Sequence, residues 1–274
     1  MPQTPIYSLP FETPQSKPGI TLTGDSDGSH PILAEAVEAV LASFEARLTA
    51  IETTGFRLLT TLYYTAPGST TPFTKGSYSG FRAARVRMVG GGGGGGGAVV
   101  TSGTEISLGA GGGGGCYAES FLLSAAIGVS ENVNVGAGGA GGVGAAGSTG
   151  GASSFGALVS ANGGNGGDSE LATGDNGVAG GNGASTGTGD LIIPGGDGSN
   201  ARNLGVTAPT ESAMGGTSFF GGARTANSTI NGANGFNARN YGSGGAGAIN
   251  DNNEVDVRTG GAGSGGLVII DVFI

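Results

Sequence analysis

Histidine and cysteine, on which many catalytic and metal sites depend, each occur once in this sequence. His30 stands just before an expected helix, and Cys116 lies between Gly115 and Tyr117. Neither a Ser-His-Asp triad nor a histidine zinc site can be assembled in one chain from a single histidine so placed. We expect Cys116 to be a small packed or exposed residue, and a single cysteine excludes an internal disulfide.

Carboxylate pairs are the next candidates for chemistry. Asp168 with Glu170, and Asp251 with Glu254, could in principle act as general acid and base in a glycosidase. Both pairs lie in polar, loop-like sequence, which favours solvated acids. We therefore expect no enzymatic activity.

Glycine motifs must be judged by their other residues, because glycine is so common here that it matches many patterns by chance. Lys17 and Lys75 follow serine and threonine, so neither completes a phosphate-binding P-loop. Residues 163–168 and 195–198 approach the calcium-binding nonapeptide pattern without its nine-residue repeat. The sequence predicts no metal and no cofactor.

Aromatic and polar side chains interrupt the glycine-rich sequence at residues 218–220, 236–241 and 250–253. Aromatic faces beside amide and guanidinium groups suit the sugars of a cell envelope. The phenylalanines could equally form hydrophobic plugs between glycine-rich layers. The candidate receptor-binding residues are Phe219, Phe220, Phe236, Arg239 and Tyr241.

Charge and hydropathy exclude two classes of partner. The net charge is −9, and the 11 basic residues form no cluster, so we expect no nucleic-acid binding. No apolar run reaches the ~18 residues of a membrane span, and the first residues lack the features of a secretory signal. We expect a protein made in soluble form inside a cell, without membrane insertion.

Composition divides the chain into three expected parts. Residues 1–28 contain five of the ten prolines and predict an extended arm, either attached to a larger particle or a disordered leader. Residues 29–54 predict a helix, capped by Ser29 and with Pro31 in its first turn. Residues 55–274 form the glycine-rich part, since only seven of the 63 glycines precede residue 90.

The expected helix carries one apolar stripe. An isolated helix of about 22 residues is marginal in water. The stripe must therefore pack on the following domain or, as we prefer, on copies of itself. Its residues are Val37, Val40, Phe44, Leu48 and Ile51.

The glycine-rich part is expected to be mainly β and to close with the strand 267–274. This apolar strand predicts burial on both faces and pairing with residues 86–89. Residues 56–63, 121–123 and 133–135 predict further strands, and residues 66–68 a turn. Because glycine has no side chain, backbone hydrogen bonds must order the glycine runs, as sheet or as polyglycine II, a helix of three residues per turn.

The order of these segments resembles the glycine-rich domain of tail-fibre and tail-tip proteins of tailed bacteriophages, common in phages of actinobacteria. The opening segment, residues 1–14, also resembles the leader of such proteins. The resemblance covers residues 56–274, and its matching segments are residues 86–97, 111–121, 133–142, 150–156 (GGASSFG), 163–167 and 260–270 (GGAGSGGLVII).

The resemblance implies a structural and adhesive role in the virion, at the distal end of the tail, without enzymatic activity. It also implies a homotrimer, and we expect the helix to form a short trimeric coiled coil. Residues 1–28 would join other tail proteins, and loops between residues 190 and 256 would contact a glycan or protein of the host cell envelope. The alternative is a purely structural tail component, and we disfavour a secreted cell-wall or ice-binding protein.

Overall fold

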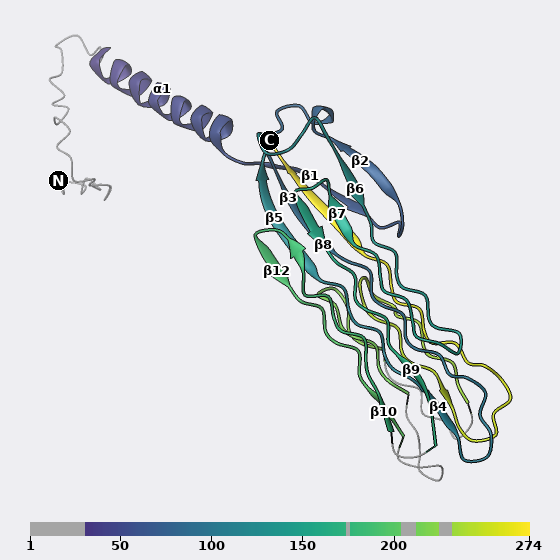
Figure 1. Ribbon diagram of the computed structural model, residues 1–274. Coiled ribbons are helices and arrows are strands. Elements are labelled where there is room, and N and C mark those ends of the chain that lie inside the picture. Colours follow the sequence, from purple (N-terminus) through teal and green to yellow (C-terminus); the bar gives the residue numbers. More distant parts are fainter. Residues whose placement is uncertain (1–30, 174–175, 204–211, 225–231) are drawn as a thin grey trace, which may run out of the picture. The chain divides into compact units, whose positions relative to one another are not determined.

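The computed structural model describes residues 31–173, 176–203, 212–224 and 232–274 (Figure 1). The chain divides into a unit of residues 1–55 and a unit of residues 56–274, which we take one at a time. The expected attachment arm, residues 1–28, lies outside the described residues.

The first unit contains the helix α1 (Pro31–Thr54), which ends immediately before Gly55, as predicted. Proline is favoured at the first helical position because its missing N–H would have no helical partner there. Four of the predicted stripe residues are exposed, Val37 by 49%, Val40 by 65%, Phe44 by 66% and Leu48 by 49%. Ile51 lies within α1, but its side chain is outside the description. Over the described residues, no helix is long and apolar enough to cross a membrane.

The second unit begins with a five-stranded antiparallel sheet. Its order is β1 (Leu58–Tyr64), β15 (Leu267–Phe273), β3 (Ala83–Val89), β5 (Tyr117–Leu123) and β12 (Leu191–Ile193). Ile270 pairs with Val86 and Leu267 with Val89, which confirms the predicted pairing of the last strand. β15 is buried along almost its whole length because it has a strand on either side and a core beneath.

A second antiparallel sheet lies against the first. Its order is β11 (Gly187–Thr188), β8 (Val159–Ala161), β7 (Ser153–Phe155), β6 (Ser130–Asn134) and β2 (Thr70–Thr74), and a short 3-10 helix, η1 (Lys75–Ser77), follows β2. The predicted turn before β2 is present, with Gly68 at φ 73°. Alternate residues of both sheets, including Val86, Met88, Ile270, Phe73 and Phe155, form the largest hydrophobic core.

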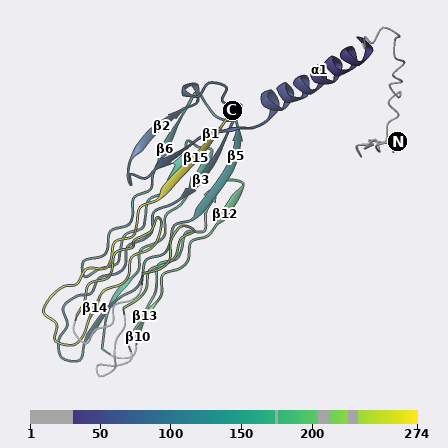
Figure 2. The same ribbon diagram turned by 180° about the vertical axis from the view of Figure 1, so that it is seen from behind.

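Beyond the two sheets, extended passes of chain run side by side to the far end of the unit (Figures 1 and 2). We call these passes the shaft and its two ends the sheet end and the far end. The shaft comprises residues 90–97, 110–116, 135–152, 162–168, 179–186, 194–200, 212–217, 232–248 and 258–266.

Hydrogen bonds in the shaft recur every third residue. In residues 90–97, the N–H groups of Gly90, Gly93 and Gly96 donate to the pass 110–116. Those of Gly91, Gly94 and Gly97 donate to 145–151, and those of Gly92 and Gly95 donate to 261–264. The carbonyl oxygens of residues 91–96 accept hydrogen bonds with the same three-residue period from the passes 162–168, 136–142 and 242–248. One pass is therefore bonded to six neighbours.

This packing explains the uninterrupted glycine of residues 90–97. A Cβ atom at Gly93, Gly94 or Gly95 would overlap the carbonyl oxygen of Asn165, Ala140 or Ala246, respectively. A pass with neighbours on all sides has no room for a side chain. At about 0.5–1.5 kcal/mol net each, these backbone bonds supply the stability that side chains supply in an ordinary core.

An outer pass has one side that no neighbouring pass covers, and its sequence carries polar residues on that side. Residues 162–168 read Asn-Gly-Gly-Asn-Gly-Gly-Asp, and every third residue of that pass is exposed while Gly164 and Gly167 are buried. Several exposed amides bond the outermost backbone: Asn234 accepts from the N–H of Thr259 (2.9 Å) and Asn237 from that of Ala262 (2.8 Å). The three-residue period thus separates inward glycine from outward polar side chains.

Two small sheets close the far end. One has the order β14 (Ile249–Asn250), β4 (Ile106–Gly109) and β9 (Ser169–Ala172), and the other pairs β10 (Asn176–Val178) with β13 (Ala201–Asn203). Ile106, Leu108, Val178 and Ile249 belong to a second hydrophobic cluster there. The second unit is mainly β, as predicted, with a core at each end of a glycine-rich shaft.

Candidate functional site

The loop of residues 251–257, at the far end, is the candidate site. It joins β14 to the last pass of the shaft. Asn253 has φ 58°, a left-handed conformation that asparagine tolerates better than most residues, and its Oδ1 accepts from the N–H of Gly103 (3.0 Å). The loop therefore has a defined backbone and is tied to a second loop.

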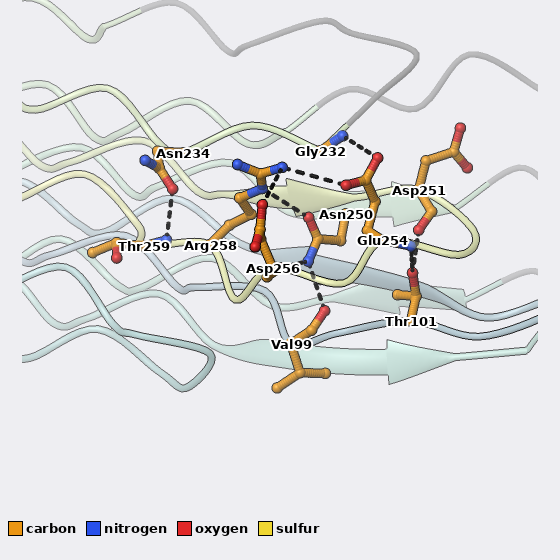
Figure 3. Close-up of polar contacts among 10 residues, drawn as sticks. All are labelled: Val99, Thr101, Gly232, Asn234, Asn250, Asp251, Glu254, Asp256, Arg258 and Thr259. Atoms are coloured by element: carbon orange, nitrogen blue, oxygen red, sulfur yellow. Dashed lines mark hydrogen bonds and ion pairs between the residues drawn. The ribbon is translucent and has the colours of Figure 1, made fainter.

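Thr101 fixes one side of the loop. Its N–H donates to the carbonyl of Glu254 (2.9 Å), and its hydroxyl accepts from the N–H of Glu254 (2.9 Å). The same hydroxyl donates to the carbonyl of Asp251. One small side chain thereby bonds both halves of the loop (Figure 3).

Asn250 lies at the centre of the network and is fully buried. Its Nδ2 donates to the carbonyls of Val99 (2.8 Å) and Asp256 (2.7 Å), and its Oδ1 accepts from Arg258 Nε (3.2 Å). A buried amide must satisfy its donors and acceptor, and Asn250 does so with Asp256 of the loop, with Arg258 directly after it and with Val99 of a separate segment (Figure 3).

Arg258 completes the network with charge. Its Nη2 lies 3.3 Å from Glu254 Oε2 and 3.7 Å from Asp256 Oδ2. Glu254 Oε1 also accepts from the N–H of Gly232 (3.1 Å). These partly exposed ion pairs are each worth about 0–1 kcal/mol, so the buried Asn250 is the stronger constraint on the loop.

The constrained loop displays apolar side chains. Val255 is 83% exposed and Val257 49%, and Val143, on a neighbouring turn, is 67% exposed. A Cβ at Gly144, whose φ is 57°, would meet the side chains of Val257 and Val99. Exposed apolar groups held in a fixed arrangement are typical of contact surfaces.

The carboxylates at this end are engaged in structure. Asp251 accepts from the N–H of Asn252 (2.9 Å), and Glu254 is bonded to Arg258 and Gly232. Across the described ranges, no group of three or more histidine, cysteine or acidic residues is placed to hold a metal ion.

Phe219 and Phe220, two of the candidate receptor-binding residues, lie at the sheet end. The Phe219 ring stacks on Tyr117 (centroids 4.1 Å apart), and Phe220 meets Phe219 edge-on (5.1 Å). Phe220 also packs on the buried cluster of Val89, Leu267 and Ile269. Phe220 therefore packs as the hydrophobic-plug alternative expects, while Phe219 keeps 53% of its surface exposed.

The other three candidates do not join them in one site. Tyr241 is 38% exposed and lies near Phe219, because its carbonyl accepts from the Ser218 hydroxyl. Phe236 lies further along the shaft, where its carbonyl accepts from Ala246 (3.0 Å) and Arg224 covers its ring at 4.6 Å. Arg239 is exposed on the pass between Phe236 and Tyr241. Residues 250–253, the third loop predicted from the sequence, belong to the far-end site.

A second polar cluster lies on the outer face of the five-stranded sheet. Tyr117 Oη donates to Glu119 Oε2 (2.5 Å), and Arg85 contacts the same carboxylate at 2.6 Å. Burial, with the Glu119 hydrogen bond, raises the pKa of Tyr117 well above its usual range. Burial tends to raise the pKa of Glu119, but the hydrogen bonds of Tyr117 and Arg85 and the nearby positive charges outweigh it and lower that pKa.

Cys116 lies inside the shaft next to this cluster. It is fully buried, and burial raises the pKa of its thiol. Of the two environments expected for this residue, the packed one is correct.

Reasoning from the sequence found residues 250–253 and named Glu254 only as a solvated acid, but it missed Thr101 and Arg258. The segment 254–258 alternates charged residues with valine, which signals an exposed loop. No local signal reveals Thr101, which precedes its partner by about 150 residues.

Comparison with known proteins adds one finding. The model of a family described as a glycine-rich domain matches residues 69–273. Among curated proteins, none matches this chain.

Proposed function

The chain belongs to this glycine-rich domain family, and we propose that it is a non-enzymatic, structural and adhesive subunit of a bacteriophage tail fibre or tail tip that contributes to attachment to the host cell surface. Family membership gives the glycine-rich character alone. The phage origin and distal-tail location rest on the resemblance of the ordered segments. The adhesive role rests on the constrained, exposed loop at the end of the shaft.

In this proposal the shaft is a bundle of polyglycine II-like segments. The observation that carries it is the three-residue hydrogen-bond period of residues 90–97, which have six neighbouring passes. An extended helix of three residues per turn points successive N–H groups in three directions. Such a bundle is a stiff mount for loops.

Self-association follows from the exposed apolar residues of α1. Val40 and Phe44 are each about two-thirds exposed, and an amphipathic helix gains stability mainly by burying its apolar face. Three copies of α1 would form a short coiled coil and align three shafts. Residues 1–28 would then join other tail proteins.

Host contact occurs through the far-end loop, with a glycan or protein of the cell envelope as partner. Three copies on one particle would lengthen residence on the host through multivalency, without strong single sites. Binding through a pre-organised loop also avoids the cost of ordering it on contact.

The alternative, a purely structural tail component, is supported by one observation. Phe219 and Phe220, predicted to contact a receptor, pack against Tyr117 and each other, so part of their aromatic surface serves the fold. In that case a different tail protein recognises the host.

Two measurements test the proposal. Electron microscopy of the virion with antibody against the chain should label the distal tail, and labelling elsewhere would refute the location. Purified protein should bind host cells and compete with phage adsorption. Trimers on the distal tail that never bind host cells would favour the structural alternative.

A further inference from the structure

A polar groove runs along the side of the shaft, close to the second sheet. Its volume is about 440 Å³, within the range of about 300–1,000 Å³ common for small-molecule sites. Three passes form it. The lining residues are Thr149, Gly150, Ala152, Asn162, Gly163, Asn165, Asn182, Gly183, Ala184, Ser185 and Thr186.

Two side-chain amides of the groove are unengaged. Elsewhere, the exposed side chains of Asn200, Asn237 and Asp197 accept hydrogen bonds from the backbone of neighbouring passes. Within the described part of the chain, the side chains of Asn165 and Asn182 make no hydrogen bond, although both line the groove. Their donors and acceptors are available to a ligand.

The remaining groups in the groove fit the same chemistry. Asn162 Nδ2 donates to the Thr186 hydroxyl (2.6 Å), which fixes one end of the groove. Thr149 and Ser185 add hydroxyls, and Ala152 adds a methyl group. Amides and hydroxyls both donate and accept, which matches the hydroxyls of a sugar.

Charge selects against anions. None of the lining residues is charged, and Asp197 holds the N–H of Gly183 at 2.8 Å from an adjoining pass. The groove therefore favours a neutral ligand.

Part of the backbone along the groove is already bonded within the shaft. The N–H of Gly150 donates to Gly164, that of Asn165 to Asn182, and that of Ala184 to Gly114. These three N–H groups are therefore not available to a ligand.

We propose that this groove binds a neutral oligosaccharide through the side-chain amides of Asn165 and Asn182. The assignment rests on the proposed attachment function and adds to the far-end loop a second contact, whose ligand is a neutral glycan of the cell envelope. The groove has no aromatic platform, so a single site is expected to bind weakly, with a Kd of roughly 1 mM, and three copies would act together.

Saturation-transfer NMR on the full chain tests the assignment, with maltotriose, cellotriose and triacetylchitotriose as neutral probes and trigalacturonate as an anionic one. We expect at least one neutral trisaccharide to give signals that fall at least fivefold in Asn165→Ala/Asn182→Ala. The matched control, Asn132→Ala, removes an exposed amide of β6 outside the groove and should leave the signals unchanged.

The assignment would be overturned if none of the three neutral trisaccharides gave a saturation-transfer signal, or if the double variant gave signals equal to those of the wild type. Both amides are exposed and unengaged, so the double variant should fold with an unchanged Tm. Host-cell binding by the wild-type protein separates the two claims. If the protein binds cells but no sugar gives a signal, only the glycan assignment of the groove is refuted. If the protein never binds cells, the attachment function is refuted.

Discussion

The N–H of Gly94 donates to the carbonyl of Ser148 (2.9 Å), and the carbonyl of Gly94 accepts from Gly167 (2.9 Å). Segments far apart in the sequence are thus joined through one residue that has no side chain. Similar bonds at each residue of the run from 90 to 97 make the shaft a backbone-stabilised structure, and the predictions below follow from it.

Gly94→Ala should destabilise the shaft, because the new methyl group would overlap the carbonyl oxygen of Ala140. Overpacking typically costs about 1–3 kcal/mol, which corresponds to a fall in Tm of about 2–4 °C for each kcal/mol in a domain of this size. Thermal unfolding measures it. Gly76→Ala is the control, since a Cβ there meets nothing within 4 Å, and an equal Tm for both variants would contradict the packing.

Asn250→Ala should loosen the far-end loop. The carbonyls of Val99 and Asp256 lose a donor, and Arg258 loses an acceptor. Leaving buried polar groups unpaired costs about 1–3 kcal/mol. Limited proteolysis should cut within residues 251–257 faster than in the wild type, whereas Asn252→Ala, which removes an exposed side chain, should not change the rate. Equal rates for Asn250→Ala and wild type would show that the network does not hold the loop.

Val255→Asp should weaken host attachment without affecting folding. The side chain is 83% exposed, so the fold does not need it, but it lies on the proposed contact loop. A loss of about 1.4 kcal/mol at the contact would lower binding to host cells about tenfold. Val129→Asp is a matched control outside the shaft, directly before β6, where the valine is 77% exposed. Unchanged binding by Val255→Asp, or an equal loss for both, would exclude the loop as the contact.

Phe44→Glu should convert trimers to monomers. Phe44 is 66% exposed in α1, and a charge there would be buried in a coiled coil without a partner. Light scattering after size exclusion would give the mass, with Glu45→Gln, exposed on the same helix, as control. A wild-type monomer, or a trimer that survives Phe44→Glu, would disprove assembly through α1.

Acid should destabilise the sheet end through Glu119. Its folded pKa is lowered below the ordinary 4.5, so its stabilising contribution is present above the unfolded pKa and is lost as the pH falls. Between about pH 5 and about pH 3, Glu119→Gln should therefore lose less Tm than the wild type. Parallel losses in the two proteins would indicate that other carboxylates govern the acid transition. Tyr117 affects stability at high pH. Because its folded pKa is raised, its contribution to stability is lost as the pH rises above the ordinary pKa of 10.0.

Much of the fold could be predicted because it depends on local patterns. Pro31 and Gly55 delimit the helix, and the apolar run from Leu267 predicted a doubly covered strand and its partner. The observed strand boundaries differ from the predicted ones where pairing extends or distorts a strand. β1 begins at Leu58 and contains an irregularity between Leu58 and Thr60 in its pairing with β15, and β6 begins at Ser130 because it pairs with β2.

The arrangement of the passes could not be predicted, because every glycine run offers the same bonding groups. Nothing in residues 90–97 says that Gly93 bonds Gly113 and Gly94 bonds Ser148. The sequence does, however, separate inner from outer passes: continuous glycine marks an enclosed pass, and one polar residue in three, as in 162–168, marks an exposed one. The far-end site could not be predicted for the same reason, since Thr101 and Glu254 meet only in the folded chain.

Amide hydrogen exchange of residues 90–97 in the assembled protein tests the central claim most directly. Each of these eight N–H groups donates to a neighbouring pass inside the shaft, so all eight should be among the slowest to exchange. Exchange as fast as that of an unstructured glycine peptide would contradict a hydrogen-bonded shaft.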